Sequence, residues 1–429
     1  MTIALSPEQK RAVNLAVNSR DHIFITGRAG CGKSVVLREI AKRKGEKGVI
    51  AASTGIAALN VGGQTLHRLV GVGTALPADL GVDLHRVKSK RLWLNDLETI
   101  IIDEISMVSA DLMDSIDRML RYIRGNRSEP FGGLQLVMIG DPYQLPPVAT
   151  KEDRKYYQSQ GYNSPWFFDA QVWEEVGFKT IELQTIFRQN DDTFKDLLNA
   201  VRDGSADPEQ VGLLNALGAR AGKTENALLL GGTNKIVSER NRQGLAKLPG
   251  RTHVYEARVS RGFGREEPAE RRLELKQGAH VMMLNNDDQD RWVNGSRGII
   301  TNVWPDSISV QLDDTEEVVD IGRHAWVPGG TPPDGYADAP KYWQLPVKLA
   351  WAVTIHKSQG LSLPEIEVDM GQYGAFEGGQ TYVALSRAID PWGVYFKTPL
   401  TMADIKVDPF VKKFFTELER VSEDDSEEV

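Results

Sequence analysis

The sequence predicts an α/β protein with two parallel-sheet domains, the second of which is interrupted by a small β-barrel. Three patterns support this prediction: apolar runs that alternate with amphipathic segments, a glycine-rich loop motif directly after the first run, and a later block of short strands. The 429 residues are enough for two or three domains with sizeable cores.

Composition excludes several classes of protein. No run approaches the ~20 apolar residues of a membrane helix, and the first residues, MTIALSPEQK, lack the pattern of a secretory signal. We therefore expect a cytoplasmic protein. A single cysteine, Cys31, rules out an internal disulfide or a cysteine-based zinc cluster. The net charge of −8 excludes a basic nucleic-acid coat, so any nucleic-acid site must be a local basic groove.

The first domain is predicted from apolar runs that read as buried strands. These runs are 22–26 (HIFIT), 48–53 (GVIAAS), 98–104 (ETIIIDE), 134–141 (LQLVMIGD) and 179–183 (KTIEL). Helical patterns lie between them at Ser34–Lys44, Ala110–Arg124 and Trp166–Val176. Runs that are apolar on both faces indicate a parallel sheet covered by helices.

The second domain is predicted as a split unit. A strand at 227–233 and a helix through Leu248 are followed much later by apolar runs at 348–356, 366–370 and 393–397. Short strands with turn residues fill the interval, which favours an inserted β-barrel. The expected bounds are 1–185 for the first domain, 186–249 with 346–412 for the second, 250–345 for the barrel with its return linker at 329–340, and 413–429 for an acidic tail.

GRAGCGKS (27–34) matches the P-loop motif and has the required strand before it and helix after it. Its backbone N–H groups can bind phosphate oxygens, Lys33 can reach the β- and γ-phosphates, and Ser34 can bind Mg²⁺. A chance match in a glycine-rich turn is the alternative. We expect Cys31 to fill space in this loop. The predicted nucleotide contacts in the loop are Gly27, Ala29, Gly30, Cys31, Gly32, Lys33 and Ser34.

Two further strand ends carry polar residues. Asp103 and Glu104 end one apolar run, where a P-loop NTPase needs a carboxylate for Mg²⁺ and a base for the attacking water. We assign Asp103 to the metal and Glu104 to the base. Gln144, in GDPYQLPPV (140–148), is placed to sense a γ-phosphate or water. A solvated strand end and a rigid turn are the respective alternatives.

The ordered set GRAGCGKS, DEIS, GDPYQLPPV, IFRQ, VTIHKSQG and YVALSR resembles the superfamily 1 DNA helicases. Within them it is most similar to the 5′-to-3′ branch that contains RecD and the Pif-type (petite integration frequency) helicases. The resemblance extends from Gln9 to about Phe396. It implies two RecA-like domains with ATP between them, a small insertion in the first and an SH3-like β-barrel in the second.

The resemblance also implies roles for single residues. Gln9 corresponds to the residue that recognises adenine, and Gly360 to a glycine that approaches the γ-phosphate. Arg188 and Arg387 resemble the two arginine fingers, whose guanidinium groups stabilise charge on the transferring phosphoryl group. Without the motifs, both arginines would be read as surface charges or ion-pair members.

For DNA, the resemblance implies contacts from hydroxyl, amide, histidine and lysine side chains that hold the backbone without reading sequence. The matching positions are Thr54, Asn60, Thr65, His67, Thr354, His356, Lys357 and Ser358. The segment 69–94, with its basic stretch HRVKSKRLW (85–93), occupies the place of the strand-separating insertion, although a solvated basic face is the alternative. The acidic turn NNDDQD (285–290) is read as a solvated hairpin tip.

The implied function is an ATP- and Mg²⁺-dependent DNA helicase that moves 5′ to 3′ on single-stranded DNA and unwinds tailed or forked duplex, or quadruplex, DNA. It would act as a monomer, or as a dimer on DNA, without a membrane partner. The shortness of the chain relative to eukaryotic Pif-type members favours a bacterial or phage source. Two alternatives stay open: a nucleic-acid-stimulated ATPase that remodels RNA or protein–DNA complexes, and a binding module that uses ATP only as a switch.

Overall fold

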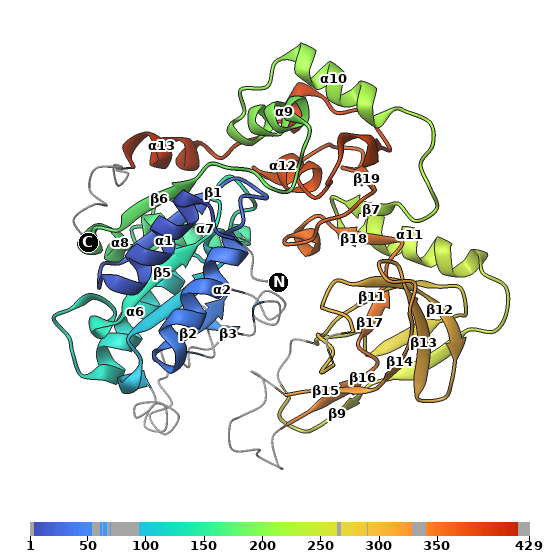
Figure 1. Ribbon diagram of the computed structural model, residues 1–429, viewed down its shortest axis with the longest axis horizontal. Helices are drawn as coiled ribbons and strands as arrows, with labels where there is room; N and C mark the ends of the chain where they lie inside the picture. The colour runs from blue at the N-terminus through green and yellow to red at the C-terminus, as the bar shows by residue number, and fades with distance from the viewer. Residues whose placement is uncertain are drawn as a thin grey trace. The chain divides into compact units, whose positions relative to one another are not determined.

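The computed structural model describes residues 4–53, 61, 63–66, 69, 94–263, 267–289, 291–327 and 340–418. Its contacts form two compact units (Figure 1). Unit 1 comprises Met1–Gln210, Phe376–Ser386 and Met402–Val429, and unit 2 comprises Val211–Ala375 and Arg387–Thr401. Within the described ranges, no helix has the length and apolar character needed to span a membrane. Most of the expected insertion at 69–94 and of the linker at 329–340 lies outside these ranges.

Unit 1 is built on a six-stranded parallel sheet in the order β3-β2-β4-β5-β1-β6. The strands are β1 (Ile23–Gly27), β2 (Gly48–Ala52), β3 (Gln64–Thr65), β4 (Thr99–Asp103), β5 (Gln135–Ile139) and β6 (Lys179–Leu183). The five strands predicted for this domain are confirmed. Because all strands are parallel, their carboxyl ends meet at one edge of the sheet.

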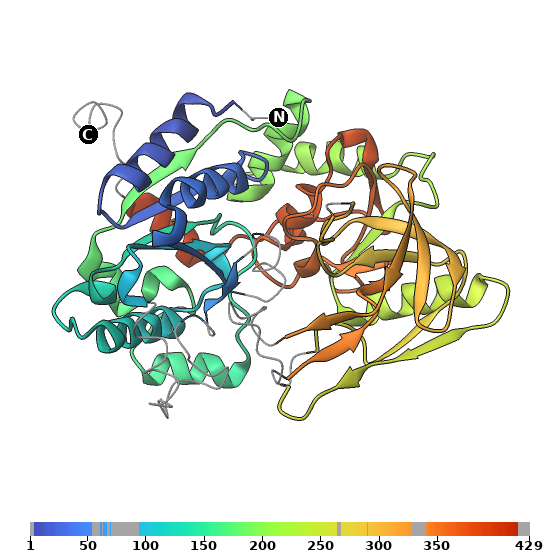
Figure 2. The same ribbon diagram turned by 60° about the horizontal axis from the view of Figure 1, so that its bottom comes forward.

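Helices cover both faces of this sheet (Figure 2). They are α1 (Pro7–Asn18), α2 (Lys33–Lys44), α6 (Ala110–Arg124), α7 (Lys151–Ser159), α8 (Gln171–Val176) and α13 (Pro409–Glu417). Unit 1 also contains α9 (Asp192–Asp203) and α12 (Gln380–Leu385), which contact each other, and α10 (Pro208–Gly218) lies at the unit boundary. Short 3₁₀ turns are η1 (Gly45–Lys47), η3 (Ile105–Met107), η4 (Pro130–Gly133), η5 (Phe167–Asp169) and η8 (Met402–Asp404).

Alternate residues of each central strand enter the two cores. Ile23 and Ile25 of β1 pack with α1 and α2, whereas Phe24 packs with α6 and η5 on the other face. This alternation, with both sets buried, is why the strands read as continuous apolar runs.

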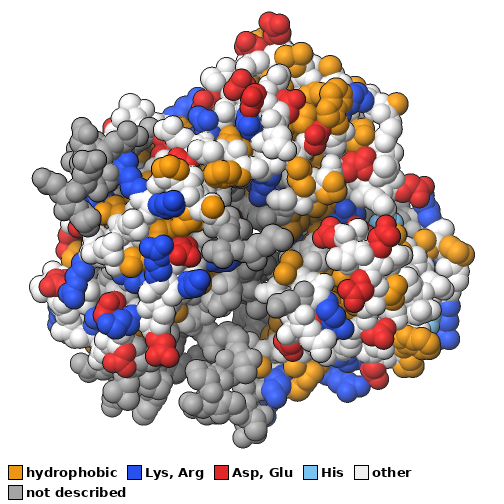
Figure 3. Space-filling model, viewed as in Figure 1, with side chains coloured by type: hydrophobic (Ala, Val, Ile, Leu, Met, Phe, Trp, Pro, Cys, Tyr) orange, Lys and Arg blue, Asp and Glu red, His pale blue; other side chains and the backbone are white. Residues whose placement is uncertain are grey.

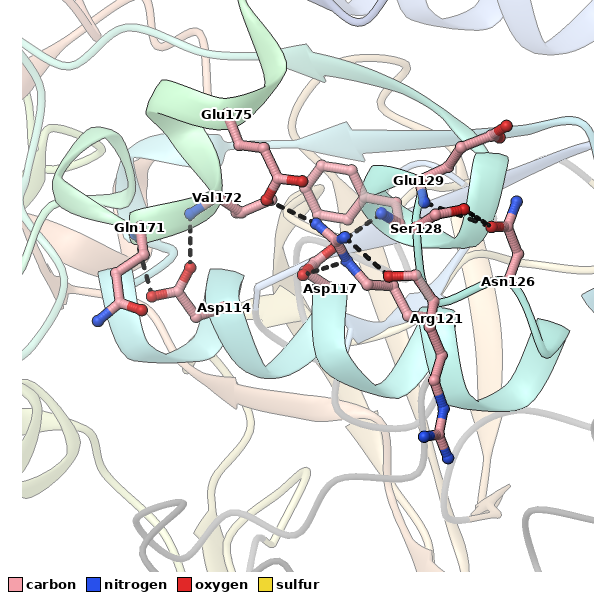
Figure 4. Close-up of polar contacts among 11 residues, drawn as sticks. Asp114, Asp117, Arg121, Asn126, Ser128, Glu129, Gln171, Val172 and Glu175 are labelled. Atoms are coloured by element: carbon pink, nitrogen blue, oxygen red, sulfur yellow. Dashed lines mark hydrogen bonds and ion pairs between the residues drawn. The ribbon is translucent and has the colours of Figure 1, made fainter.

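Helix α6 carries buried carboxylates that hold neighbouring turns (Figure 4). Asp114 accepts hydrogen bonds from the backbone N–H groups of Gln171 (3.1 Å) and Val172 (2.9 Å) at the start of α8. Asp117 accepts from the backbone N–H of Phe131 in η4 (2.6 Å) and pairs with Arg121. These carboxylates replace the side-chain caps that the first turns of α8 and η4 lack.

The prediction of a single helix at Trp166–Val176 is wrong. The segment forms the turn η5 and then α8, with extended backbone at Ala170 (ψ 142°) between them. Asp169 accepts from the backbone N–H groups of Asn163 (2.6 Å) and Ser164 (2.8 Å). This bonding and the cap from Asp114 stabilise two short turns in place of one helix.

The unit boundaries differ from the expected domain bounds. Residues 186–210, 376–386 and 402–412, expected in the second domain, belong with unit 1. A buried ion pair between Arg202 of α9 and Asp141 after β5 (2.9 Å) is one physical reason. The tail expected from residue 413 is also wrong at its start, because 413–417 lie in α13, where the Phe414 ring packs 4.2 Å from that of Phe168.

Unit 2 combines a parallel sheet in the order β18-β7-β19-β20 with antiparallel sheets. The parallel strands are β7 (Leu228–Gly231), β18 (Ala352–Thr354), β19 (Ile366–Asp369) and β20 (Val394–Phe396), with α11 (Asn234–Lys247), η6 (His356–Ser358) and η7 (Pro391–Gly393). A five-stranded antiparallel sheet contains β14 (Val318–Gly322), β13 (Ser307–Leu312), β12 (Arg297–Val303), β11 (His280–Met283) and β17 (Val347–Leu349). Smaller sheets pair β8 (His253–Glu256) with β10 (Arg272–Leu275), and β9 (Arg258–Val259) with β16 (Tyr342–Gln344) and β15 (His324–Trp326).

The split predicted for the second domain is present, with one correction. The run 348–356 is divided, because β17 belongs to the antiparallel sheet and β18 to the parallel one. The antiparallel strands therefore extend to Leu349, past the expected bound at 345. The acidic turn is described as far as Gln289, and its Asp287 pairs with Arg291 (2.8 Å).

Candidate nucleotide site and nucleic-acid cavity

The predicted phosphate site lies at the carboxyl edge of the sheet in unit 1. β4, β5, β1 and β6 are neighbours in that order, and each is followed directly by predicted site residues. Asp103 ends β4, Gln144 follows β5, the P-loop follows β1, and Arg188 follows β6. Parallel pairing of these strands thus brings four segments that are far apart in the sequence to one edge of the sheet.

The P-loop has the geometry of an anion site. α2 begins at Lys33, so its N-terminal N–H groups face the loop. The Lys33 ammonium donates to the carbonyl oxygens of Gly27 (2.6 Å) and Arg28 (2.9 Å). Cys31 is fully buried, and burial raises the pKa of its thiol. Its position agrees with the expected space-filling role.

Gln9 lies directly against this loop. Its side-chain carbonyl accepts from the backbone N–H of Ser6 (3.0 Å), and its amide donates to the carbonyl of Cys31 (3.1 Å). Gly32 has φ 82°, and a Cβ there would lie 2.4 Å from the Gln9 amide nitrogen. The left-handed backbone favours glycine here, and a side chain would also displace the Gln9 amide. Recognition of adenine by Gln9 stays a prediction.

Asp103 and Glu104 form a half-buried acidic pair. Burial, and then the charge of Glu104, raise the pKa of Asp103, while Lys33 opposes the shift. Glu104 has left-handed backbone (φ 50°), an uncommon conformation for a side-chain-bearing residue that is often retained at functional sites. Its Oε2 is buried and lacks a hydrogen-bond partner among the described residues. Such an oxygen is suited to a water or a cation.

Gln144 and Arg188 complete the edge in unit 1. Gln144 is 4% exposed, and its side-chain oxygen is buried without a hydrogen-bond partner in the described part of the chain. Arg188 donates to the carbonyl of Ser386 (2.8 Å), and burial lowers its pKa. The backbone N–H of Phe187 donates to Gly30 (2.9 Å), which holds the Arg188 segment against the P-loop.

Arg387 and Gly360 belong to unit 2. Arg387 is 2% exposed, and its guanidinium lies 3.5 Å from the carbonyl oxygens of Ser358 and Leu361. Gly360 has φ 79° and open space where a Cβ would stand. These two predicted residues therefore share a small region of unit 2, and their roles toward ATP stay predictions.

A cavity of about 340 Å³ opens in unit 2 between α11, β10, β17, β18 and η6. It brings together Thr354 and Lys357, two of the predicted DNA contacts. Asn241 of α11 fixes one wall, because its side chain accepts from the backbone N–H of Ala352 (2.9 Å) and donates to the carbonyl of the same residue (3.0 Å).

Cations dominate the charge of this cavity. Four cationic and two acidic side chains line it, namely Arg242, Arg272, Lys348, Lys357, Glu270 and Glu274. Arg242 pairs with Glu239, and Arg272 with Glu274. Neither Lys348 nor Lys357 forms an ion pair with a residue that the structure describes. On the face shown in Figure 3, by contrast, cationic and acidic side chains are interspersed.

Lys348 is a residue that sequence reasoning missed. Burial, and then the charge of Lys357, lower its pKa to about 8. In the sequence it is only the first residue of the strand-like run 348–356, and a lysine at the end of a strand reads as an ordinary exposed position. A poorly solvated ammonium beside a second one favours an anionic ligand.

The other predicted DNA contacts have varied positions. Thr54, Asn60 and His67 lie outside the described residues, and Thr65 lies in β3 at the edge of the unit 1 sheet. His356 is partly exposed in η6. Ser358 is fully buried and its hydroxyl donates to the carbonyl of Ile355 (2.7 Å), so the structure does not bring it into the cavity.

Two parallel α/β sheets, a P-loop and an acidic pair at the sheet edge define a P-loop NTPase of RecA-like architecture. The sequence pattern of the PIF1-like helicase family matches residues 4–212, and that of the DNA helicase Pif1 2B domain matches residues 265–303. The ATP-dependent DNA helicase Pif1 of Bdellovibrio bacteriovorus is 34% identical, over 97% of this chain and 93% of that protein. The chain belongs to the PIF1-like helicase family. This confirms the resemblance seen in the motifs.

Two further relatives extend the comparison. The ATP-dependent DNA helicase PIF1 of Rattus norvegicus is 38% identical over 90% of this chain, but the match spans only 60% of the rat protein. A crystal structure of the Pif1 helicase from Bacteroides in complex with ADP-AlF3 and single-stranded DNA has a TM-score of 0.75 and 33% identity, covering 97% of this chain and 98% of that one.

Proposed function

We propose that this protein is an ATP-dependent DNA helicase that translocates 5′ to 3′ on single-stranded DNA and unwinds tailed, forked or quadruplex DNA. One observation carries the proposal: P-loop, acidic pair, glutamine and arginine meet at one sheet edge, where buried oxygens of Glu104 and Gln144 lack partners among the described residues. These are the parts that a hydrolytic P-loop site needs. The Bdellovibrio and rat relatives are named ATP-dependent DNA helicases, which supports the proposed helicase activity.

Each residue predicted to act on the nucleotide has a proposed role. The P-loop amides and Lys33 bind the β- and γ-phosphates, and Gln9 contacts the base. Glu104 accepts a proton from the attacking water, which Gln144 orients. Arg188 and Arg387 stabilise charge on the phosphoryl oxygens, and Gly360 approaches the γ-phosphate.

Mg²⁺ fits the residues present. Ser34 and Asp103 would hold it, because a carboxylate whose pKa is raised by burial and by Glu104 gains most from a nearby cation. The ion would neutralise charge between the β- and γ-phosphates. Ser34 is exposed at the start of α2 and open to such a ligand.

Single-stranded DNA is proposed to bind the unit 2 cavity through its phosphates. Thr354, Lys357 and Lys348 supply a hydroxyl and two cations without base-reading groups, as a translocase requires. Thr65 and His356, with Thr54, Asn60 and His67, complete the proposed contacts. The Bacteroides Pif1 helicase in complex with single-stranded DNA supports the choice of ligand, and the cationic lining of the cavity supports its place.

The finer architecture belongs to the same proposal. The five-stranded antiparallel sheet is proposed to be an SH3-like barrel inserted in the second RecA-like domain, and 69–94 the strand-separating insertion of the first. We also propose a bacterial or phage source, which the Bdellovibrio relative supports, and a cytoplasmic location. The protein would work as a monomer, or as a dimer on a fork.

The test is ATP hydrolysis with and without single-stranded DNA, and unwinding of duplexes with a 5′ or a 3′ tail. Wild type should be stimulated by DNA and unwind from the 5′ tail only. Lys33→Ala should lose both activities, and Lys42→Ala, which removes an exposed lysine from the same helix, should keep them. Stimulation without unwinding would favour a remodelling ATPase, and no stimulation would refute the helicase.

A further inference from the structure

Tyr382 of α12 contacts the P-loop although it lies some 350 residues away in the sequence. Its side chain is 3% exposed. Its hydroxyl accepts a hydrogen bond from the backbone N–H of Ala29 (2.7 Å) and donates one to Oδ2 of Asp141 (3.3 Å). All three residues belong to unit 1. None of the roles assigned above uses this hydroxyl.

Asp141 fixes the direction of the Tyr382 hydroxyl. The carboxylate is fully buried and accepts from Nε (3.1 Å) and Nη2 (2.9 Å) of Arg202. Burial lowers the pKa of the Arg202 guanidinium, but the charge of Asp141 raises it by more, so the net pKa lies above its ordinary value. A carboxylate only accepts, so the phenolic proton points to Asp141 and the oxygen lone pairs face Ala29.

The Arg28–Ala29 peptide is consequently held at both ends. Tyr382 accepts from its N–H, and its carbonyl accepts from the Lys33 ammonium (2.9 Å). A planar peptide moves as one body, so fixing the N–H also fixes the carbonyl. Lys33 has three donors, of which Gly27 and Arg28 take two. Among the described residues, the third donor has only a weak contact with the Cys31 sulfur (3.9 Å), which a phosphate oxygen can replace.

Helix α12 is itself anchored where it meets the P-loop. Gly379, just before the helix, has φ 76°, and a Cβ there would lie 2.4 Å from the carbonyl oxygen of Gln144. The Thr381 hydroxyl donates to the carbonyl of Asp404 (2.6 Å). These contacts fix α12 against the Gln144 loop, and Tyr382 contacts the P-loop from this anchored helix.

We propose that Tyr382 is a positioning residue for the nucleotide. By fixing the Arg28–Ala29 peptide, its hydroxyl holds Lys33 on two carbonyl oxygens and aims the remaining ammonium donor at the phosphates. Without the hydroxyl, only the long bond from the backbone N–H of Cys31 to the Arg28 carbonyl (3.4 Å) and Lys33 itself hold the peptide. The peptide can then rotate, and Lys33 loses one of its two fixed acceptors. The proposal rests on the proposed function, because it presumes a nucleotide at the P-loop.

Tyr382→Phe removes only the hydroxyl. Because Lys33 and the P-loop bind substrate and transition state alike, we expect KM for ATP and Kd for ADP to rise about tenfold, the value of one hydrogen bond, with kcat unchanged within about twofold. The matched control is Tyr162→Phe, which removes the hydroxyl of another buried tyrosine that donates to an aspartate of unit 1, Asp114 (2.6 Å).

Calorimetric ADP binding, ATPase kinetics and thermal denaturation without nucleotide separate the outcomes. A positioning role predicts similar melting temperatures for both variants but weaker ADP binding in Tyr382→Phe alone. Equal ADP affinities, or a fall in kcat with KM unchanged, would overturn the proposal. If wild type and Lys33→Ala both fail to bind ADP, it is the proposed function that fails. If these two differ while Tyr382→Phe binds as wild type does, only the role of Tyr382 is refuted.

Discussion

Lys348 should make DNA binding depend on pH. Its pKa of about 8 means that the protonated fraction in the free protein is about 0.9 at pH 7 and about 0.1 at pH 9. A phosphate binds the protonated form, and the apparent affinity scales with the fraction that is competent. The Kd for single-stranded DNA should therefore rise about tenfold between pH 7 and pH 9.

The neighbouring charges bear on this prediction. Lys357 lowers the pKa of Lys348, while Glu270, whose own pKa is raised by burial, acts in the opposite direction. The remaining charged groups around the cavity are Arg242, Arg272 and Glu274. A phosphate between the two lysines relieves their repulsion, so DNA should raise the pKa of Lys348.

Stability should change in the opposite sense to DNA binding. The unfolded lysine has a pKa of 10.5, so between about pH 8 and 10.5 the unfolded chain binds the proton that the folded chain has released. The contribution of Lys348 to the free energy of unfolding therefore rises over this window. At pH 7 the buried cation costs about 3 kcal/mol, which Lys348→Met should recover in part while it weakens DNA binding.

The assay is fluorescence anisotropy with a labelled oligo(dA) strand, whose phosphates and bases do not titrate between pH 7 and 9. Lys348→Arg, which stays charged, should bind with a Kd that is flat over this range. Lys348→Met should bind weakly throughout, and Lys247→Met, at an exposed lysine of α11, should behave as wild type. A pH dependence that persists in Lys348→Arg would refute the reasoning, because another group would then be titrating.

Three predictions concern unit 1, each measured as the free energy of unfolding in urea. Asp117→Ala should cost about 2 kcal/mol, because it leaves the backbone N–H of Phe131 buried without its acceptor; a change within error would mean that water replaces the carboxylate. Arg202→Met should cost about 3–5 kcal/mol, since it leaves Asp141 buried and unpaired. Adding Asp141→Asn should restore part of that loss, and no recovery would show that the unpaired charge is not its cause. Gly379→Ala should destabilise by about 1 kcal/mol or more through its left-handed backbone and the 2.4 Å approach of a Cβ to a carbonyl oxygen; wild-type stability would show that the loop relaxes freely.

The sequence predicted the parts of the fold that depend on local pattern. Strands buried on both faces are continuous apolar runs, so β1 to β6 were visible apart from the two-residue β3. α6 was predicted at its observed ends because an apolar stripe and Gly125 at the C-cap define it. The helix expected at Trp166–Val176 failed because its geometry depends on Asp114, more than fifty residues earlier in the chain.

The candidate site was predictable to the extent that motifs mark strand ends. Lys33, Asp103, Glu104 and Gln144 all follow apolar runs, and a parallel sheet must bring such ends to one edge. Lys348 was not predictable, because what distinguishes it is burial beside Lys357, a property of tertiary packing. Similarly, no local pattern could show that α12 would pack on the P-loop.

The buried polar groups of unit 1 show why residues that are distinguished by tertiary packing cannot be predicted from the sequence. Asp114 and Asp117 stand on a helix whose pattern reads as charged on one side, yet both are less than 10% exposed. Each accepts from the backbone N–H of another turn, whereas Asp141 accepts from the side chains of Arg202 and Tyr382. A buried carboxylate is tolerated only where donors converge on it. Each of these three carboxylates therefore joins segments that are apart in the sequence, and at Asp141 the junction reaches the P-loop through Tyr382.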